Sequence, residues 1–281
     1  MTIAAKVVAH SRVTGAPDLI TLQLRYPRFI HAEFMTHRVF SRNASSSRAI
    51  PIERMIQDVI DDPAMPVAWG SNKPGMQAGA ELTGSMLELA QRSWQTACRF
   101  AIHEAKNLAA VGAHKQIVNR LLEPFAHISV VVTATEWQNF FALRCHPDAD
   151  PTMRALAEAM RDAIKASEPN DWIIGDWHLP YVDAETLGAL YARHKSDSDG
   201  TMRMLAMISA ARCARVSYLN HDGSNPDLDK DLALARRLLE SKHMSPFEHQ
   251  AQVMGHGVLE RAFQGNFVRW KQHRKMIEVQ Q

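Results

Sequence analysis

The sequence predicts an α/β (α+β) fold in which a small, mostly antiparallel sheet packs with long helices. Two runs of β-forming residues, 3 to 9 and 18 to 26, flank turn formers at 14 to 17, which predicts an antiparallel pair. From 86 to 111, apolar or small residues recur in steps of three and four, which predicts a long amphipathic helix with an alanine-rich face. The β-branched run 127 to 134 predicts a buried strand.

Two segments between these elements are predicted to be irregular. Residues 36 to 50 are too polar for a core strand and too rich in Ser and Asn for a helix interior, so we expect a loop that enters a helix near Pro51. Residues 62 to 80 are rich in Pro, Gly and Met. Because helical patterning resumes directly after them, we expect an excursion from one domain and not a linker between two.

The second half of the chain is predicted to be mainly helical. A helix from 135 to 143 follows the buried strand. Asp150 and Pro151 are typical of an N-cap and first turn, and they predict a helix that ends before Pro169. Residues 170 to 182 are predicted to be a loop. Two more helices are expected at 201 to 216 and at 227 to 241.

Composition limits the classes of function. Of the 281 residues, 46% are hydrophobic and 22% are charged, which is typical of a globular protein. Lys plus Arg number 32 against 30 for Asp plus Glu, so the chain lacks the bulk positive charge of sequence-independent nucleic-acid binders. No apolar run approaches the roughly 20 residues of a membrane span, and the opening residues lack the apolar stretch of a signal peptide. We therefore expect no membrane partner and a cytoplasmic location.

The cysteines and histidines do not predict a metal site. Cys98, Cys145 and Cys213 are far apart and odd in number, which argues against a disulfide framework and leaves no CxxC pair. No HExxH or finger-spaced Cys/His pair occurs. Cys145 lies between Arg144 and His146, a setting that suits a nucleophile, but a lone cysteine is more often a small buried hydrophobe.

The segment 36 to 50 is dense in hydrogen-bond donors. The planar guanidinium groups of Arg38, Arg42 and Arg48 match phosphate oxygens, and Asn43 with the serines at 45 to 47 adds short donors. Two interpretations follow from the spacing. The segment is either a site for a nucleotide phosphate or a solvated loop whose serines form turns.

Two further segments contain candidate site residues. In 137 to 149, Asn139 and Arg144 flank two phenylalanines. On a helix they would lie within about two turns and suit an aromatic ligand, but an ordinary amphipathic helix with a C-terminal arginine is an equal alternative. In 242 to 250, histidines and a glutamate cluster, which predicts either a capped turn before a strand or a catalytic His/Glu pair.

These segments together resemble the flavin-dependent thymidylate synthase family, which makes dTMP from dUMP with a flavin. The family signature is an Arg-His-Arg followed at fixed spacing by Ser, Asn, Ser and Arg. The corresponding residues are Thr36, His37, Arg38, Ser41, Asn43, Ser46 and Arg48. Three further family elements are matched by Arg120 to Pro124, by Asn139 to Arg144, and by His243 to His249.

The order of these elements resembles a circular permutation. In most members the Ser-Pro-Phe-Glu-His element and an Ala-Ala-Arg run come first, whereas here they come last, in about 201 to 281, with the run at 210 to 212. Such a change is tolerated when the termini are close and exposed. Residues 269 to 275 partly repeat the first signature without its Ser-Asn-Ser-Arg. Phage-type members share this order, so we expect one domain, 1 to 281, and the host cytoplasm if the gene is phage-encoded.

The resemblance implies the thymidylate synthase-complementing protein fold and an FAD-dependent transferase. The enzyme would move a one-carbon unit from methylenetetrahydrofolate to C5 of dUMP and reduce it with hydride from the flavin, which NADPH reloads. Arg144 is implied to be catalytic and to stabilise negative charge on the pyrimidine ring, because a guanidinium cannot act as a general base. Family members are homotetramers with shared sites, and the helix at 86 to 111 offers a packing face.

The resemblance also implies the binding residues. The substrate-binding positions are Glu33, Thr36, Ser46, Ser47, Arg48, Arg120 and Arg144. The cofactor-binding positions are His37, Arg38, Ser41, Asn43, Asn139, His243, Ser245 and Glu248.

Three positions differ from the family pattern and leave the substrate open. Thr36 replaces the first Arg, Glu33 replaces a Gln, and Ala44 replaces a Glu. Cytosine N3 is an acceptor, so a guanidinium suits neutral cytosine as well as deprotonated uracil. Methylation or hydroxymethylation of dCMP is therefore the alternative reaction. A nucleic-acid contact through the Arg/Ser segment is the alternative from another class of function.

Overall fold

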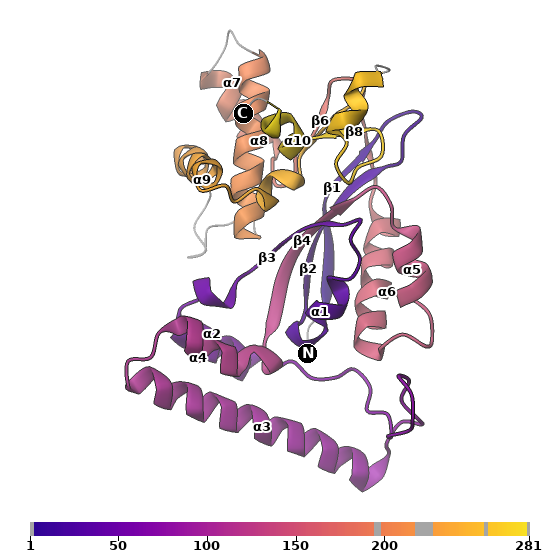
Figure 1. Ribbon diagram of the computed structural model, residues 1–281, viewed down its shortest axis with the longest axis vertical. Coiled ribbons are helices and arrows are strands. Elements are labelled where there is room, and N and C mark those ends of the chain that lie inside the picture. The colour runs from indigo at the N-terminus through magenta and orange to yellow at the C-terminus, as the bar shows by residue number, and fades with distance from the viewer. Residues whose placement is uncertain (1–2, 194–197, 217–226, 256–257, 280–281) are drawn as a thin grey trace.

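The central element of the fold is a five-stranded sheet with strand order β3-β4-β2-β1-β5 (Figure 1). The structure is a computed structural model that describes residues 3–193, 198–216, 227–255 and 258–279. The strands are β1 (Ala4–Arg12), β2 (Leu19–Pro27), β3 (Ser41–Ala44), β4 (His127–Ala134) and β5 (Asn170–Asp171). Only the short β5 pairs in parallel, with β1, so the predicted mixed fold with a mostly antiparallel sheet is confirmed for the described residues.

The first two strands form the predicted antiparallel pair. β1 pairs with β2 from Ala4 opposite Arg25 to Ser11 opposite Leu19. β2 also pairs along its length with β4, so these two strands are the middle of the sheet. The predicted strand at 127 to 134 is confirmed, since β4 has the same bounds. A β-branched run can be buried on both faces. All five β4 side chains from Val130 onward are fully or almost fully buried.

The prediction that residues 36 to 50 form a loop is partly wrong, because β3 is an edge strand on β4. Its polar side chains find partners on both faces of the sheet. Arg42 donates to two backbone carbonyls of the preceding turn, at 2.8 and 3.0 Å, and Asn43 donates to the carbonyl of Cys213 at 2.8 Å. A polar strand is stable at a sheet edge when its side chains are satisfied in this way.

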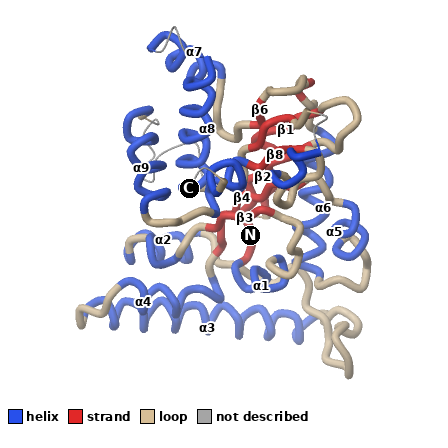
Figure 2. Tube along the Cα trace, turned by 45° about the horizontal axis from the view of Figure 1, so that its top comes forward, coloured by secondary structure: helices blue, strands red, loops and turns tan. Residues whose placement is uncertain are grey.

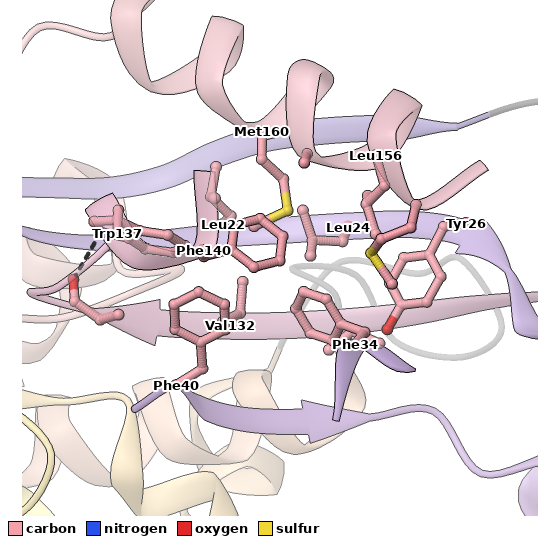
Figure 3. Packing of buried hydrophobic residues seen from close by; sticks show 14 of the residues in the cluster. Leu22, Leu24, Tyr26, Phe34, Phe40, Val132, Trp137, Phe140, Leu156 and Met160 are labelled. Atoms are coloured by element: carbon pink, nitrogen blue, oxygen red, sulfur yellow. Dashed lines mark hydrogen bonds between the residues drawn. The ribbon is translucent and has the colours of Figure 1, made fainter. Parts of the chain in front are cut away.

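One face of the sheet is covered by α1 (His31–Phe34), α5 (Gln138–Arg144) and α6 (Pro151–Ala166). Figure 3 shows the aromatic part of this core, in which Phe34, Phe40 and Phe140 pack together over β2 and β4. The predicted helix after Asp150 is confirmed. Asp150 is its N-cap, and its carboxylate accepts two backbone N–H bonds at 2.9 Å. The predicted helix at 135 to 143 is confirmed with a later start.

A helical layer lies beyond one end of the sheet (Figures 1 and 2). It consists of α2 (Ile52–Asp61), α3 (Gly84–Ala110) and α4 (Lys115–Leu122), and the predicted helices near Pro51 and at 86 to 111 are confirmed as α2 and α3. The sequence did not predict α4. The 27-residue α3 buries only Cys98 and Ala105, while Met86, Leu89 and Phe100 are more than half exposed.

A C-terminal block covers part of the other face of the sheet (Figure 1). It contains a three-stranded sheet of β6 (Trp177–His178), β7 (Ala251–Val253) and β8 (Trp270–Gln272). Its helices are α7 (Ala184–Arg193), α8 (Ser198–Arg215), α9 (Leu228–Glu240) and α10 (His273–Glu278). The predicted helices at 201 to 216 and 227 to 241 are confirmed as α8 and α9. The predicted loop at 170 to 182 contains two-residue strands, β5 and β6, which are too short to give a sequence signal.

A buried line of hydrogen bonds, which we call the histidine–threonine chain, joins this block to the central sheet. It consists of His178, Thr21, Thr133 and His249, all fully buried. His178 Nε2 lies 2.8 Å from Thr21 Oγ1, the two threonine oxygens are 2.7 Å apart, and His249 Nδ1 lies 2.8 Å from Thr133 Oγ1. Short hydrogen bonds between fully buried groups fix the relative position of the elements that they join.

Candidate active site

The segment 36 to 50 lies where the sheet, the helical layer and the C-terminal block meet. It leaves α1, forms β3, and ends in the short 3₁₀ helix η2 (Ser47–Ala49) before α2. Three other 3₁₀ helices pack near it, namely η1 (Arg28–Ile30), η3 (Glu123–Phe125) and η4 (Ser245–Glu248). Each family element matched in the sequence therefore comes into contact with this one segment or with its neighbours.

Three residues form what we call the arginine cluster: Arg144, His37 and Glu33. Arg144 is the last residue of α5, and its Nε donates to His37 Nε2 at 2.9 Å. Its Nη1 donates to the carboxylate of Glu33 on α1. The side chains of Arg144 and Glu33 are 19% and 34% exposed, so the cluster is accessible from solvent.

The imidazole of His37 is neutral at neutral pH and fixed in one orientation. Burial lowers its pKa, and the positive charge of Arg144 lowers it further. Its ring packs edge-to-face on Phe140, with the ring centroids 4.8 Å apart. Since Nε2 accepts the hydrogen bond from Arg144, the proton of the neutral ring is assigned to Nδ1. A neutral acceptor therefore holds the guanidinium without neutralising its charge.

The predicted phosphate residues divide into an exposed group and one buried residue. Ser46, Arg48 and Arg120 are exposed, and neither arginine has an ion pair in the part of the chain that the structure describes. Ser47 is buried instead, and its hydroxyl donates to Glu123 at 2.6 Å. Its hydroxyl is therefore engaged by a carboxylate that the sequence analysis did not single out.

Two further residues bring the exposed group together. Asn119 on α4 donates to the carbonyls of Ser47 and Ile50 at 2.8 and 3.0 Å, which holds η2 against α4. Arg28 pairs with Glu123 at 3.0 Å and balances its charge. Because Asn119 precedes Arg120 and Ser47 precedes Arg48, the two exposed arginines lie next in sequence to the residues that join η2 to α4.

The predicted cofactor residues Asn43 and Ser245 contact each other across 202 positions of sequence. Ser245 Oγ donates to Asn43 Oδ1 at 3.1 Å, while the Asn43 amide is held by the Cys213 carbonyl. The two residues join β3 to η4 and α8.

Ser41 and Glu248 are linked through the C-terminal strand and helix. Ser41 is fully buried and accepts a hydrogen bond from Gln272 at 3.0 Å. The same Gln272 amide donates to the Glu248 carbonyl at 3.2 Å. The Glu248 carboxylate is paired with Arg274 on α10. The 269 to 275 segment, which partly repeats the first signature, therefore supplies both partners.

The remaining predicted residues lie on the surface, and in the described part of the chain only Thr36 among them has a hydrogen bond to another predicted residue. Thr36, Arg38 and Asn139 are exposed, and the Thr36 hydroxyl donates to the carbonyl of Glu33 at 2.7 Å. His243 is exposed as well, and its Nδ1 lies 2.8 Å from Ser241 Oγ. One chain by itself therefore does not gather all of the predicted ligands.

The sequence did not single out several residues that shape this region, among them Asn119, Glu123, Gln272 and Arg274. Arg274 alone had a usable signal, because it stands where the repeated motif places its arginine. Cys145, by contrast, has a raised pKa, because burial outweighs its neighbouring charges. A thiol with a raised pKa is a poor nucleophile, in agreement with its interpretation as a structural residue.

A separate hollow of about 490 Å³ lies at the tip of the β1–β2 hairpin. Its lining includes Val13, Trp172, Ile173, Val253 and Arg269, and none of the predicted site residues. Within the described residues, no group of three or more potential metal ligands lies together, and no helix is long and apolar enough to cross a membrane.

Comparison with known proteins identifies the family of the chain. A family model described as thymidylate synthase complementing protein matches residues 10–170, more than half of the chain. The chain therefore belongs to this family, that of the flavin-dependent thymidylate synthases, and the resemblance found in the sequence is confirmed. No match was found among curated proteins.

Two solved structures are similar in fold to part of the chain. Both are of a UMP/dUMP methylase, PolB from Streptomyces cacaoi, bound with 5-Br UMP or with 5-Br dUMP. The first has a TM-score of 0.46 and 19% identity, and covers 58% of this chain and 88% of its own. The second has a TM-score of 0.49 and 17% identity, and covers 58% of this chain and 90% of its own.

Proposed function

We propose that this protein transfers a one-carbon unit from methylenetetrahydrofolate to C5 of a deoxypyrimidine monophosphate and reduces it to a methyl group. The reaction of the family, dUMP to dTMP, is the starting hypothesis for the substrate. The observation that carries the proposal is the arginine cluster, in which a partly exposed guanidinium is fixed by two side chains beside the family signature.

The balance of the reaction defines what the site must do. The C5–H bond of the pyrimidine breaks, a C5–carbon bond forms, the methylene carbon gains a hydride, and tetrahydrofolate leaves. FAD, when bound in its reduced form, supplies that hydride, and NADPH restores the reduced form. The chain itself must bind the nucleotide, stabilise negative charge on the ring, and exclude water.

Arg144 is proposed to stabilise the negative charge that develops on the ring. Its charge is preorganised, because Nε is held by a neutral imidazole and Nη1 by a carboxylate. Groups that are fixed before the reaction need not reorganise during it, which is the main source of electrostatic catalysis. Arg144 remains protonated throughout, so it orients and stabilises and does not carry the C5 proton.

The nucleotide phosphate is proposed to bind Ser46, Arg48 and Arg120. All three are exposed, and the two arginines are free of ion pairs among the described residues, which leaves their planar donors for phosphate oxygens. Ser47 is proposed to position this group, since its hydroxyl is held by Glu123.

The exposed residues among the predicted cofactor-binding positions suit an anionic dinucleotide such as FAD. Arg38 offers an exposed guanidinium without an ion pair among the described residues for a pyrophosphate, and Asn139 and His243 offer amide and imidazole groups to a ring. Ser41, Asn43, Ser245 and Glu248 are proposed to form the rigid wall behind the cofactor, because their side chains already hold one another or the C-terminal elements. His37 would hold Arg144 in place beside the ring.

We further propose a homotetramer in which sites are shared between subunits. The exposed apolar residues of α3, Met86, Leu89 and Phe100, support this, because a 27-residue helix that buries two residues lacks a complete packing partner within the described part of its own chain. Shared sites would also explain why one chain leaves Asn139 and His243 apart. The chain 1 to 281 would form one domain, with about 201 to 281 moved to its C-terminus.

The test of the proposed function is turnover by the purified protein. The protein is loaded with FAD, supplied with NADPH and methylenetetrahydrofolate, and offered dUMP and dCMP separately, with products identified by mass. We expect a yellow protein and a product one methyl group heavier from at least one nucleotide. A colourless protein that binds DNA with steep salt dependence and turns over neither nucleotide would refute the proposal in favour of a nucleic-acid contact.

A further inference from the structure

The carboxylate of Glu33 stands where the family signature has a glutamine, and it contacts the guanidinium of Arg144. Glutamine is neutral and offers both a donor and an acceptor, whereas a carboxylate offers acceptors only. The exchange therefore changes which groups a ligand must present beside Arg144. It also adds a negative charge next to the residue proposed to stabilise negative charge.

The hydrogen bonds of the arginine cluster leave specific groups for a ligand. Arg144 uses Nε on His37 and one Nη1–H on Glu33, so three of its five N–H groups have no partner in the described part of the chain. Glu33 engages Arg144 through Oε1, and its Oε2 has no protein partner among the described residues. The cluster thus presents a fork of donors beside one open carboxylate oxygen.

That pattern is complementary to one pyrimidine edge. Cytosine presents acceptors at O2 and N3 and a donor at its 4-amino group, which match the donor fork and then the carboxylate. Uracil presents an acceptor at O2, a donor at N3–H and an acceptor at O4. With uracil, N3–H would face the guanidinium and O4 would face the carboxylate, so two of three positions would be mismatched. Deprotonation of N3 would correct the first mismatch and leave the second.

We propose that Glu33 is a specificity-determining residue that accepts a hydrogen bond from the 4-amino group of deoxycytidine monophosphate. This inference rests on the proposed function, which sets the pyrimidine edge against Arg144. The product of the same one-carbon chemistry is then 5-methyl-dCMP, because C5 loses its hydrogen and the 4-amino group is retained. With dUMP, the open Oε2 of the partly exposed Glu33 would face the acceptor O4 without a hydrogen bond, and that penalty disfavours dUMP.

The position of Glu33 is fixed by its surroundings, which supports its role in recognising the pyrimidine edge. Glu33 lies on α1 next to Phe34, whose ring packs against Tyr26 of β2. Both aromatic side chains belong to the main core, so the backbone that carries Glu33 is held by that core. The backbone carbonyl of Glu33 accepts from both the amide and the hydroxyl of Thr36, at 3.1 and 2.7 Å. Thr36, the residue that replaces the first Arg of the signature, therefore caps the turn that carries Glu33.

The experiment is equilibrium binding of dCMP and dUMP to the purified full-length protein by calorimetry, with Glu33→Gln as the variant. We expect the wild type to bind dCMP roughly 10-fold or more tightly than dUMP, since one matched base-edge contact discriminates by about that factor. Glu33→Gln should remove most of this preference. The matched control is Glu158→Gln on α6, an ion-paired surface glutamate that should leave the preference unchanged.

A second probe does not depend on how the variant folds. The pyrimidin-2-one deoxynucleotide lacks the 4-amino group, so the wild type should bind it more weakly than dCMP by about the factor that Glu33→Gln loses. Equal or tighter binding of dUMP by the wild type would overturn the inference and leave the proposed function intact. Binding of neither nucleotide by a folded wild type would overturn both.

Discussion

The arginine cluster and the histidine–threonine chain are both polar, yet they differ in burial and in whether their central side chains are fully hydrogen-bonded, although Nε2 of His249 at the end of the chain has no partner among the described residues. In the cluster, Arg144 and Glu33 are partly exposed and keep donors and an acceptor without protein partners in the described residues. In the chain, Thr21 and Thr133 are fully buried and bonded on both sides. Partly exposed groups without protein partners are available to a ligand, whereas hydrogen bonds between buried groups hold parts of the structure together.

The signature segment contributes to both kinds of region. His37 belongs to the cluster, while Ser41 and Asn43, four and six positions later, are held by the C-terminal block. A shared motif therefore does not imply a shared role. The structure separates the residues with free groups from those that hold the site together, and the following predictions test that separation.

The largest effect is expected for Arg144→Ala. Removing a preorganised charge of this kind costs about 3 kcal/mol or more, so methyl transfer should fall by at least two orders of magnitude while the flavin remains bound. Turnover and the flavin absorption spectrum measure the two quantities. Arg161→Ala, at a partly exposed, ion-paired arginine on α6, is the matched control. Unchanged turnover in Arg144→Ala would remove Arg144 from the chemistry.

Three buried histidines of the C-terminal block should make the free energy of unfolding depend on pH. Burial lowers the pKa of His178 and His249 to about 3, and that of His273 to about 4. In the unfolded chain these histidines have a pKa of about 6.5, so below that pH the unfolded state binds protons that the folded state does not.

The free energy of unfolding should therefore fall as pH falls from about 6.5 toward 4. Each buried histidine contributes about 1.4 kcal/mol per pH unit within that window. Urea unfolding at a series of pH values measures this slope. His146→Gln, at an exposed histidine, should not alter it. A free energy of unfolding that stays constant between pH 6.5 and 5 would contradict neutral buried histidines.

A smaller loss of stability is expected for Thr133→Val. The substitution keeps the shape of the side chain and removes the hydroxyl that joins Thr21 to His249, leaving buried groups unsatisfied at a cost of about 1–3 kcal/mol. Urea unfolding measures the loss. Thr14→Val, in the exposed hairpin turn, is the control and should be nearly neutral. Equal effects of the two substitutions would mean that the histidine–threonine chain does not stabilise the fold.

The smallest effects are expected for two neighbouring serines, which should respond in opposite ways. Ser46→Ala should raise KM for the nucleotide about five-fold, through loss of one hydrogen bond worth roughly 1 kcal/mol, with unfolding unchanged. Ser47→Ala should lower the free energy of unfolding by about 1 kcal/mol, because Glu123 loses one donor and keeps Arg28. Steady-state kinetics and urea unfolding distinguish them. The same response from both serines would show that the division between free and engaged hydroxyls is wrong.

The elements that the sequence predicted correctly have strong local signals. β4 is a continuous β-branched run, and α6 begins at an aspartate that caps it and a proline. β3 was missed because its polarity is compensated by partners such as Gln272, which lies 231 positions away. The eight-residue α4 is too short for its period to be evident beside the 27-residue α3.

Only the candidate-site residues that belong to a family motif could be predicted from the sequence. The family elements identified Arg144, His37 and Glu33 separately, but no sequence pattern predicts that Arg144 contacts both of the others. Glu123, which engages Ser47, and Arg274, which engages Glu248, lie far from their partners in sequence. Long-range pairing of charged side chains is decided by tertiary packing and leaves no periodic trace in the chain.

C5 of the pyrimidine is proposed to react beside the arginine cluster. Release of tritium from a deoxypyrimidine monophosphate labelled at C5 measures cleavage of that bond directly and does not require the product to accumulate. We expect the FAD-loaded protein to release tritium with NADPH and methylenetetrahydrofolate, and release should be reduced at least 100-fold in Arg144→Ala, a factor that follows from about 3 kcal/mol. Equal release by the variant, or none by the wild type with either dUMP or dCMP, would contradict this proposal.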